Sequence, residues 1–198
     1  MSRALFIIDV QNDFTEGGAL GVEGGDAVAA GITAYLRAHP DRYDVVIASR
    51  DWHDGDNDNG GHFALDAEPD YVDTWPVHCV AGTVGAQYDP ALDPDLIDVH
   101  LRKGQGAPAY SIFQGTTEDG VNLSAVLDKL EVDDVDVVGI ATDFCVRASA
   151  LDAIASGRHV RVIDDLIAGV ASDSSVAALR EVAAAGAAIE VSTGKDLA

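Results

Sequence analysis

Short runs of apolar and β-branched residues recur along the chain, and each is bounded by charged or turn-forming positions. Such runs, without regular polar alternation, are typical of strands buried on both faces of a parallel sheet. They predict six strands, at 4–10, 45–49, 97–101, 135–140, 160–163 and 188–191. Between most of these runs the apolar positions follow a helical period, which predicts helices at 27–38, 123–130, 146–155 and 174–185.

The alternation of strands with helices indicates an α/β fold of three layers, in which helices cover both faces of a six-stranded, mainly parallel sheet. Gly157 and Gly186 follow the last two helices and are placed to end them. We expect the whole chain, 1–198, to form one domain, because no segment has the composition of a linker. Ligands of such sheets bind at the carboxyl ends of the strands.

The stretch 51–96 interrupts this alternation. It is rich in Gly, Asp and Pro, has little periodicity, and is longer than a connecting loop normally is. A segment of this kind is either functional or disordered. Its aromatic residues, among them Trp52, Phe63 and Trp75, favour an ordered segment, because disordered linkers are poor in aromatics.

The charge balance excludes a large class of partners. Lys and Arg number 12 and Asp and Glu number 34, so the net charge of -22 repels phosphate backbones and anionic membranes. We therefore expect neither a nucleic-acid nor a membrane partner.

The two cysteines are too few for a disulfide framework, and no secretory segment follows Met1. These features predict a cytoplasmic protein, and they are compatible with a monomer or a homo-oligomer.

Three chemically capable residues come at the ends of predicted strands. Asp9 closes the first strand, where it serves either a ligand or an ordinary turn. Lys103 follows the third strand, and is either functional or a surface lysine. Cys145 lies where the fourth strand turns into a helix, so it is either a nucleophile whose thiolate the helix stabilises or a small buried residue. Cys79 has no such setting, and we expect it to be a packing residue.

A second group of candidate residues belongs to the stretch 51–96. Asp51 and His53 lie two positions apart after the second strand, so in an extended segment their side chains face the same side. His62 and His78 follow downstream. A carboxylate with several imidazoles suits a divalent transition metal, and the competing interpretation is a set of surface histidines in a Gly-rich loop.

Taken in order, these residues lie in motifs that resemble those of the nicotinamidase/pyrazinamidase family, cysteine hydrolases related to isochorismatase. The similarity runs from about Leu5 to Val191. Each motif is short, but their order and joint presence are specific. They are Asp9 with Gln11-Asn12-Asp13-Phe14, Asp51-x-His53, Trp75-Pro76-x-His78-Cys79 with Gly82-Thr83-x-Gly85, Lys103-Gly104, and Gly139-Ile140-Ala141-Thr142-Asp143-x-Cys145-Val146.

The resemblance implies an isochorismatase-like hydrolase fold and an amidase of NAD salvage. Such an enzyme converts nicotinamide, and also pyrazinamide, into the acid and ammonia through a cysteine thioester. It implies that the catalytic triad consists of Asp9, Lys103 and Cys145. It also implies one divalent metal ion, zinc, iron or manganese, held by Asp51, His53, His62 and His78.

The resemblance also assigns the walls of the substrate pocket. The aromatic walls around the pyridine ring fall on Phe14, Trp75 and Tyr110. The oxyanion hole falls on the backbone N–H groups of Ala141 and Cys145, next to a cis peptide bond expected between Ile140 and Ala141. Phe144 occupies a position that is often histidine in relatives, so we expect a more apolar pocket edge.

Two other functions stay open on the sequence. One is a related hydrolase that acts on another small amide or carbamoyl compound, or on an isochorismate-like ether; the metal-binding residues disfavour it. The other is a non-catalytic homologue that binds a metal or a partner, which the presence of all three triad residues disfavours. Release of ammonia from nicotinamide distinguishes these alternatives.

The acidic residues are 27 Asp and 7 Glu, against three lysines, which indicates either adaptation to a saline cytoplasm or genomic base composition. If the first is correct, the melting temperature should rise steadily between about 0.01 and 1 M sodium chloride. The screening length falls from roughly 30 Å to roughly 3 Å over that range, so repulsion among surface carboxylates is removed. A melting temperature that stayed flat or fell would favour base composition.

Overall fold

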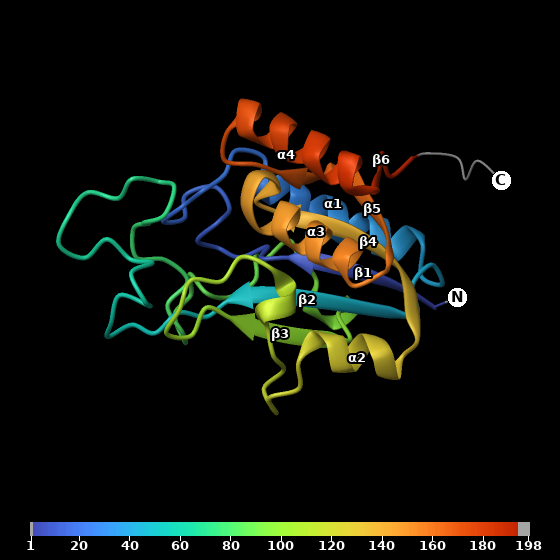
Figure 1. The fold of residues 1–198 in the computed structure, drawn as a ribbon, viewed down its shortest axis with the longest axis horizontal. Helices are drawn as coiled ribbons and strands as arrows, with labels where there is room; N and C mark the ends of the chain where they lie inside the picture. Colours follow the sequence, from blue (N-terminus) through green and yellow to red (C-terminus); the bar gives the residue numbers. More distant parts are fainter. Residues whose placement is uncertain (1, 194–198) are drawn as a thin grey trace.

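The computed structural model describes residues 2–193; Met1 and residues 194–198, with Lys195, lie outside the described part. Six strands form one sheet in the order β3-β2-β1-β4-β5-β6, and every neighbouring pair is parallel. The strands are β1 (Ser2–Ile8), β2 (Val45–Asp51), β3 (Val99–Lys103), β4 (Val132–Ile140), β5 (His159–Ala168) and β6 (Ala188–Glu190). The sheet is twisted and central, as Figure 1 shows.

Helices cover both faces of the sheet (Figure 1). The α-helices are α1 (Gly25–Ala38), α2 (Leu123–Lys129), α3 (Arg147–Ala155) and α4 (Ser172–Ala185). Shorter helical turns are η1 (Pro94–Leu96), η2 (Ile112–Gln114) and the π-helical turn η3 (Thr142–Val146). The predicted three-layer α/β fold is confirmed.

Alternate residues of each central strand contribute to two different cores. In β1, Phe6 and Ile8 join the core beneath α2, α3 and α4, whereas Leu5 and Ile7 join the core beneath α1. All four side chains are fully buried. Because both faces of the strand are covered, the run from Ala4 to Ile8 is apolar throughout, which is why its sequence reads as a strand without polar alternation.

The order of the strands brings together the segments that follow β1 and β4. The chain adds β2 and β3 on one side of β1, and β4, β5 and β6 on the other. The connections therefore diverge at β1 and β4, and their carboxyl ends open a crevice at this switch point. Asp9 follows β1, and the peptide bond between Ile140 and Ala141, which is cis as expected, follows β4.

The observed elements differ from the predicted ones mainly at their ends. The third strand covers Val99–Lys103 instead of 97–101, because Pro94 starts η1 and Ile97 caps it. The fifth strand continues to Ala168 beyond the predicted 163, past a bulge that carries Asp164 and Asp165. These two exposed acids end the apolar run in the sequence but not the strand. Gly157 and Gly186 follow their helices with positive φ, as predicted.

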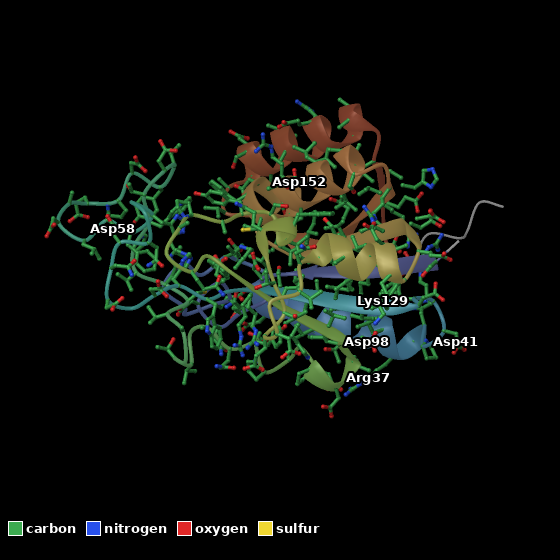
Figure 2. The ribbon with its side chains drawn as sticks, turned by 60° about the horizontal axis from the view of Figure 1, so that its bottom comes forward. Arg37, Asp41, Asp58, Asp98, Lys129 and Asp152 are labelled. Carbon is green, nitrogen blue, oxygen red and sulfur yellow. The ribbon has the colours of Figure 1, made fainter. Side chains whose placement is uncertain are left out.

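Acidic side chains are spread over the surface of the molecule. Figure 2 shows Asp58 in the stretch 51–96, Asp152 on α3, and Asp41 and Asp98 farther from that stretch. All four are exposed. Among residues 2–193, no helix combines the length and the apolar character that crossing a membrane requires.

The closest approach of β1 and β4 depends on Gly139. A Cβ at this position would lie 2.2 Å from the backbone oxygen of Ile8, and the φ of 115° is one that side-chain-bearing residues rarely adopt. Gly139→Ala should therefore lower the free energy of unfolding by about 2–3 kcal/mol or more. Gly157→Ala is the matched control, because its φ is 88° but nothing lies within 4 Å, so about 1 kcal/mol is expected. Urea unfolding midpoints measure both, and equal losses would contradict the steric argument.

Candidate active site

A buried ammonium lies at the carboxyl edge of the sheet between two carboxylates. The Nζ of Lys103 lies 2.9 Å from Oδ2 of Asp9, and it also donates to Oδ1 of Asp51 and, at 3.0 Å, to the backbone oxygen of Ala109. Asp9 and Lys103 are fully buried, and Asp51 is nearly so. The Sγ of Cys145 lies 3.9 Å from the same Nζ. The structure therefore brings the three predicted triad residues together.

The ionisation of this cluster follows from burial and from the pairing of opposite charges. Burial raises the pKa of Asp9, although the Lys103 ammonium acts against it. Burial opposes the charge on Lys103, but the carboxylates of Asp51 and Asp9 outweigh it and raise the pKa of that ammonium well above its usual value. Asp9 is held in place from its other side, because the hydroxyl of Ser49 donates to Oδ1 at 2.7 Å.

Cys145 lies in the π-helical turn η3, ahead of the α-helix α3. The sequence predicted a nucleophile at a helix start with a stabilised thiolate, and that role stays a prediction. Burial raises the pKa of the Cys145 thiol well above its usual value of 9.0, and Lys103 only partly offsets this. The thiol of Cys145 therefore holds its proton more tightly than an ordinary cysteine, and the raised pKa of Asp9 makes it a stronger base than an ordinary carboxylate. Cys79 is fully buried, consistent with packing.

Three buried histidines form a cluster, and two of them lie next to the second oxygen of Asp51. His53, His62 and His78 each offer one ring nitrogen, and these three nitrogens all lie within 4.8 Å of one another. The Oδ2 of Asp51 lies 3.6 Å from Nε2 of His53 and 3.8 Å from Nε2 of His78. Burial and the two neighbouring imidazoles lower the pKa of His62 to about 3, so all its chemistry at neutral pH is that of the neutral ring.

The hydrogen bonds of these rings leave metal-binding nitrogens in the centre. The Nδ1–H of His53 donates to the oxygen of Gly104, and the Nδ1–H of His78 donates to that of Pro76, both at 2.7 Å. Such outer bonds fix the tautomer whose Nε2 carries a free lone pair. Nε2 of His53 and Nδ1 of His62 are buried without a hydrogen-bond partner. Three imidazoles and a carboxylate fit a divalent transition metal.

A cavity of about 280 Å³ connects the thiol with this cluster. Cys145 and Ala141 lie on its wall, with His62, His78 and Asp51 also lining it. Its aromatic residues are Phe14, Tyr71, Trp75, Tyr110 and Phe144. The ring of Phe144 contacts Trp75 at a centroid distance of 4.9 Å and stacks on Tyr110 at 6.2 Å, so this edge of the cavity is formed by aromatic rings.

The structure adds positioning residues to which the sequence assigned no role. The buried amide of Gln11 donates to the backbone oxygen of Asp51 at 2.9 Å and accepts from its N–H at 2.7 Å. The carboxylate of Asp13 accepts from the N–H of Cys79 at 2.7 Å. Both residues belong to the opening motif. Ser49 carried a weaker signal, a polar residue at the end of the apolar run 45–49.

Comparisons with known proteins agree on one family. The family model described as the isochorismatase domain matches residues 3–193. The nicotinamidase/pyrazinamidase of Mycobacterium tuberculosis is 50% identical over 180 residues, which are 91% of this chain and 94% of that protein. A structure of the PnC1 protein of L. infantum in complex with nicotinate has a TM-score of 0.82 and 33% identity, covering 97% of this chain and 93% of that one. A pyrazinamidase of Pyrococcus horikoshii in complex with zinc has a TM-score of 0.81 and 33% identity, covering 96% and 99%.

The chain belongs to the isochorismatase family. Within that family it falls in the nicotinamidase group, whose members are hydrolases that act on an amide bond. The fold and the arrangement of the histidine cluster agree with this placement, and a bound divalent metal is consistent with the zinc in the P. horikoshii protein.

Proposed function

We propose that the protein hydrolyses nicotinamide to nicotinate and ammonia, and pyrazinamide to its acid, with Asp9, Lys103 and Cys145 as the catalytic residues. The observation that carries the proposal is the convergence of thiol, carboxylate and ammonium at one end of an apolar cavity that opens to a histidine cluster. The Nζ of Lys103 lies 2.9 Å from Asp9 and 3.9 Å from Sγ of Cys145. The cavity of about 280 Å³ suits one small aromatic amide.

Acylation needs only these residues. Asp9 accepts the thiol proton as Sγ of Cys145 attacks the carboxamide carbon, and the ammonium of Lys103 stabilises the negative charge on both. The oxyanion forms beside Ala141 and Cys145, whose backbone N–H groups we assign as the oxyanion hole. Collapse of the tetrahedral intermediate breaks the C–N bond, and Asp9 returns the proton to the departing ammonia.

Deacylation uses the same groups in reverse order. Asp9 takes a proton from a water molecule, the resulting hydroxide attacks the thioester carbon, and the thiol leaves with the proton. Phe14, Trp75 and Tyr110 hold the ring of the acyl group; the indole N–H of Trp75 donates to the hydroxyl of Tyr110 at 3.1 Å, which fixes both walls.

The proposal places one metal ion, zinc, iron or manganese, on Asp51, His53, His62 and His78. When bound, the metal supplies a Lewis-acid anchor for the ring nitrogen of the substrate. Gly104 supports this centre, because a Cβ there would lie 2.5 Å from Cε1 of His53.

We extend the proposal to NAD salvage in the cytoplasm, where the free thiols of Cys79 and Cys145 would stay reduced.

Cys145→Ala should lower nicotinamide turnover at least about 1000-fold, because it removes the thiol that lines the cavity 3.9 Å from the Nζ of Lys103. Nicotinamide should still bind, because the aromatic walls are unchanged. The measurement is chromatographic detection of nicotinate together with released ammonia. Cys79→Ala is the matched control and should keep near-normal activity, since Cys79 does not line the cavity. Substantial turnover by pure Cys145→Ala would refute the thioester mechanism.

The four-residue metal site predicts about one transition metal per chain by elemental analysis. His62→Ala and His53→Ala should each weaken metal binding by about 10–100-fold in competition with a chelator, because each removes a ligand. His159→Ala is the control, because this histidine is exposed at the other end of the sheet. If His62→Ala bound metal as well as His159→Ala does, His62 would be no ligand.

A further inference from the structure

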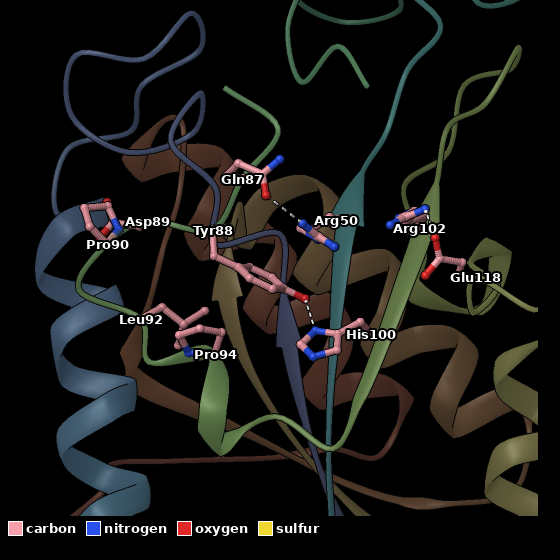
Figure 3. Close-up of a pocket in the computed structure, with 10 residues that line it drawn as sticks. All are labelled: Arg50, Gln87, Tyr88, Asp89, Pro90, Leu92, Pro94, His100, Arg102 and Glu118. Carbon is pink, nitrogen blue, oxygen red and sulfur yellow. Dashed lines mark hydrogen bonds and ion pairs between the residues drawn. The ribbon is translucent and has the colours of Figure 1, made fainter. Parts of the chain in front are cut away.

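A second cavity, of about 470 Å³, is shown with its lining residues in Figure 3. Arg50 and Arg102 line it, and they directly precede Asp51 and Lys103 on β2 and β3. Successive strand residues point to opposite faces, so the two arginines lie back to back with Asp51 and Lys103. The two cavities share no lining residue.

Arg50 and Arg102 place two positive charges directly opposite each other. Arg50 and Arg102 are register partners on neighbouring strands, an arrangement that is destabilising for two cations. Both guanidinium carbons lie near the ring of Trp52, at 4.9 Å and 4.6 Å from its centroid, and that of Arg50 lies 4.5 Å from the centroid of Tyr88. Stacking on aromatic rings holds the two groups in place while their N–H edges stay available.

Arg50 is also poorly paired for a cation in so acidic a protein. Among residues 2–193 no carboxylate forms an ion pair with it, and its Nε is buried without a hydrogen-bond partner. It donates a long hydrogen bond, 3.3 Å, to the amide oxygen of Gln87, and it also interacts with the hydroxyl of Tyr88. Arg102 pairs at 3.5 Å with Glu118, whose side chain is 80% exposed and therefore easily displaced.

His100 is a third hydrogen-bond donor on the same wall as the two arginines. The hydroxyl of Tyr88 lies 3.0 Å from Nδ1 of His100 (Figure 3). Burial, with the charges of Arg50 and Arg102, lowers the pKa of His100, so the ring is neutral at pH 7. With Tyr88 donating to Nδ1, the Nε2–H remains a donor. The opposite wall is formed by Pro90, Leu92 and Pro94. Asp89 lies beside them, and its carboxylate accepts from the hydroxyl of Thr15 and the N–H of Ala91 at 2.8 Å each.

We propose that this cavity binds a small organic anion, whose carboxylate or phosphate group lies between Arg50 and Arg102 and whose body packs against the proline wall. A planar guanidinium pair matches both oxyanions with bidentate hydrogen bonds. The net charge of -22 makes adventitious anion binding elsewhere on the molecule unfavourable. A saturable anion site in this protein therefore requires a local cluster of cations such as this one.

The test is calorimetric titration of the full-length protein, in a low-chloride buffer, with inorganic phosphate, phenyl phosphate and benzoate separately. We expect at least one probe to bind at one site per chain with a Kd of about 1 mM or tighter. Binding of the phosphates alone would identify a phosphate ligand, and binding of benzoate alone a carboxylate. Only binding that the arginine variants weaken counts, because benzoate also resembles an active-site ligand.

Arg50→Gln and Arg102→Gln should each weaken binding about tenfold or more. Arg147→Gln removes the same charge from a remote, exposed ion pair with Glu181 and should leave binding unchanged. Glu118→Gln removes the competing carboxylate and should tighten binding, which tests the site even if an arginine variant fails to fold. No saturable binding of any probe, or equal losses in Arg50→Gln and Arg147→Gln, would overturn the proposal.

Discussion

The ammonium of Lys103 is the constraint on which the rest of the site depends. It is fully buried, and moving such an ion out of water costs several kcal/mol unless opposite charges and hydrogen bonds offset that cost. Asp9, Asp51 and the oxygen of Ala109 provide this offset. Because these partners come from the ends of β1 and β2 and from the segment after β3, one ion ties three neighbouring parts of the chain together. Losing either carboxylate would leave an uncompensated buried charge, which typically costs about 3–5 kcal/mol.

Asp51 links the triad to the histidine cluster, because its two oxygens face different groups. Oδ1 accepts from Lys103, while Oδ2 faces the Nε2 atoms of His53 and His78. Although burial opposes ionisation, Lys103 and the imidazole of His53 keep the pKa of Asp51 well below its usual range. The ionised carboxylate of Asp51 in this buried site favours a cation among the histidines. Gln11 clamps the backbone of Asp51, so the position of one residue sets both centres.

The sequence predicted most of this arrangement because the relevant information is local. Apolar runs identify buried strands, and in a parallel sheet the residues after those runs must share one edge, so the neighbourhood of Asp9, Lys103 and Cys145 follows from order alone. The resemblance to known hydrolases added the roles. The π-helical turn at Cys145 and the raised pKa of its thiol could not be predicted from the sequence, because both depend on burial by segments far apart in the chain. The same limit applied to β5, where two exposed aspartates on a bulge interrupt the apolar pattern although the strand continues.

Side chains alternate between the two faces of the sheet along β2 and β3, and this alternation explains why the register of these strands is strongly specified. Asp51 opposes Lys103, and Arg50 opposes Arg102, at adjacent rungs of the same pair of strands. A slip of one residue in both strands would bring the two arginines to the buried face and turn the ion pair toward solvent. Because the buried face requires one cation with its carboxylates, that slip would bury two guanidinium groups without compensation. The ion pair on one face and the arginine pair on the other are therefore consequences of a single register, and the charges that serve the chemistry also select the pairing of the strands that carry them.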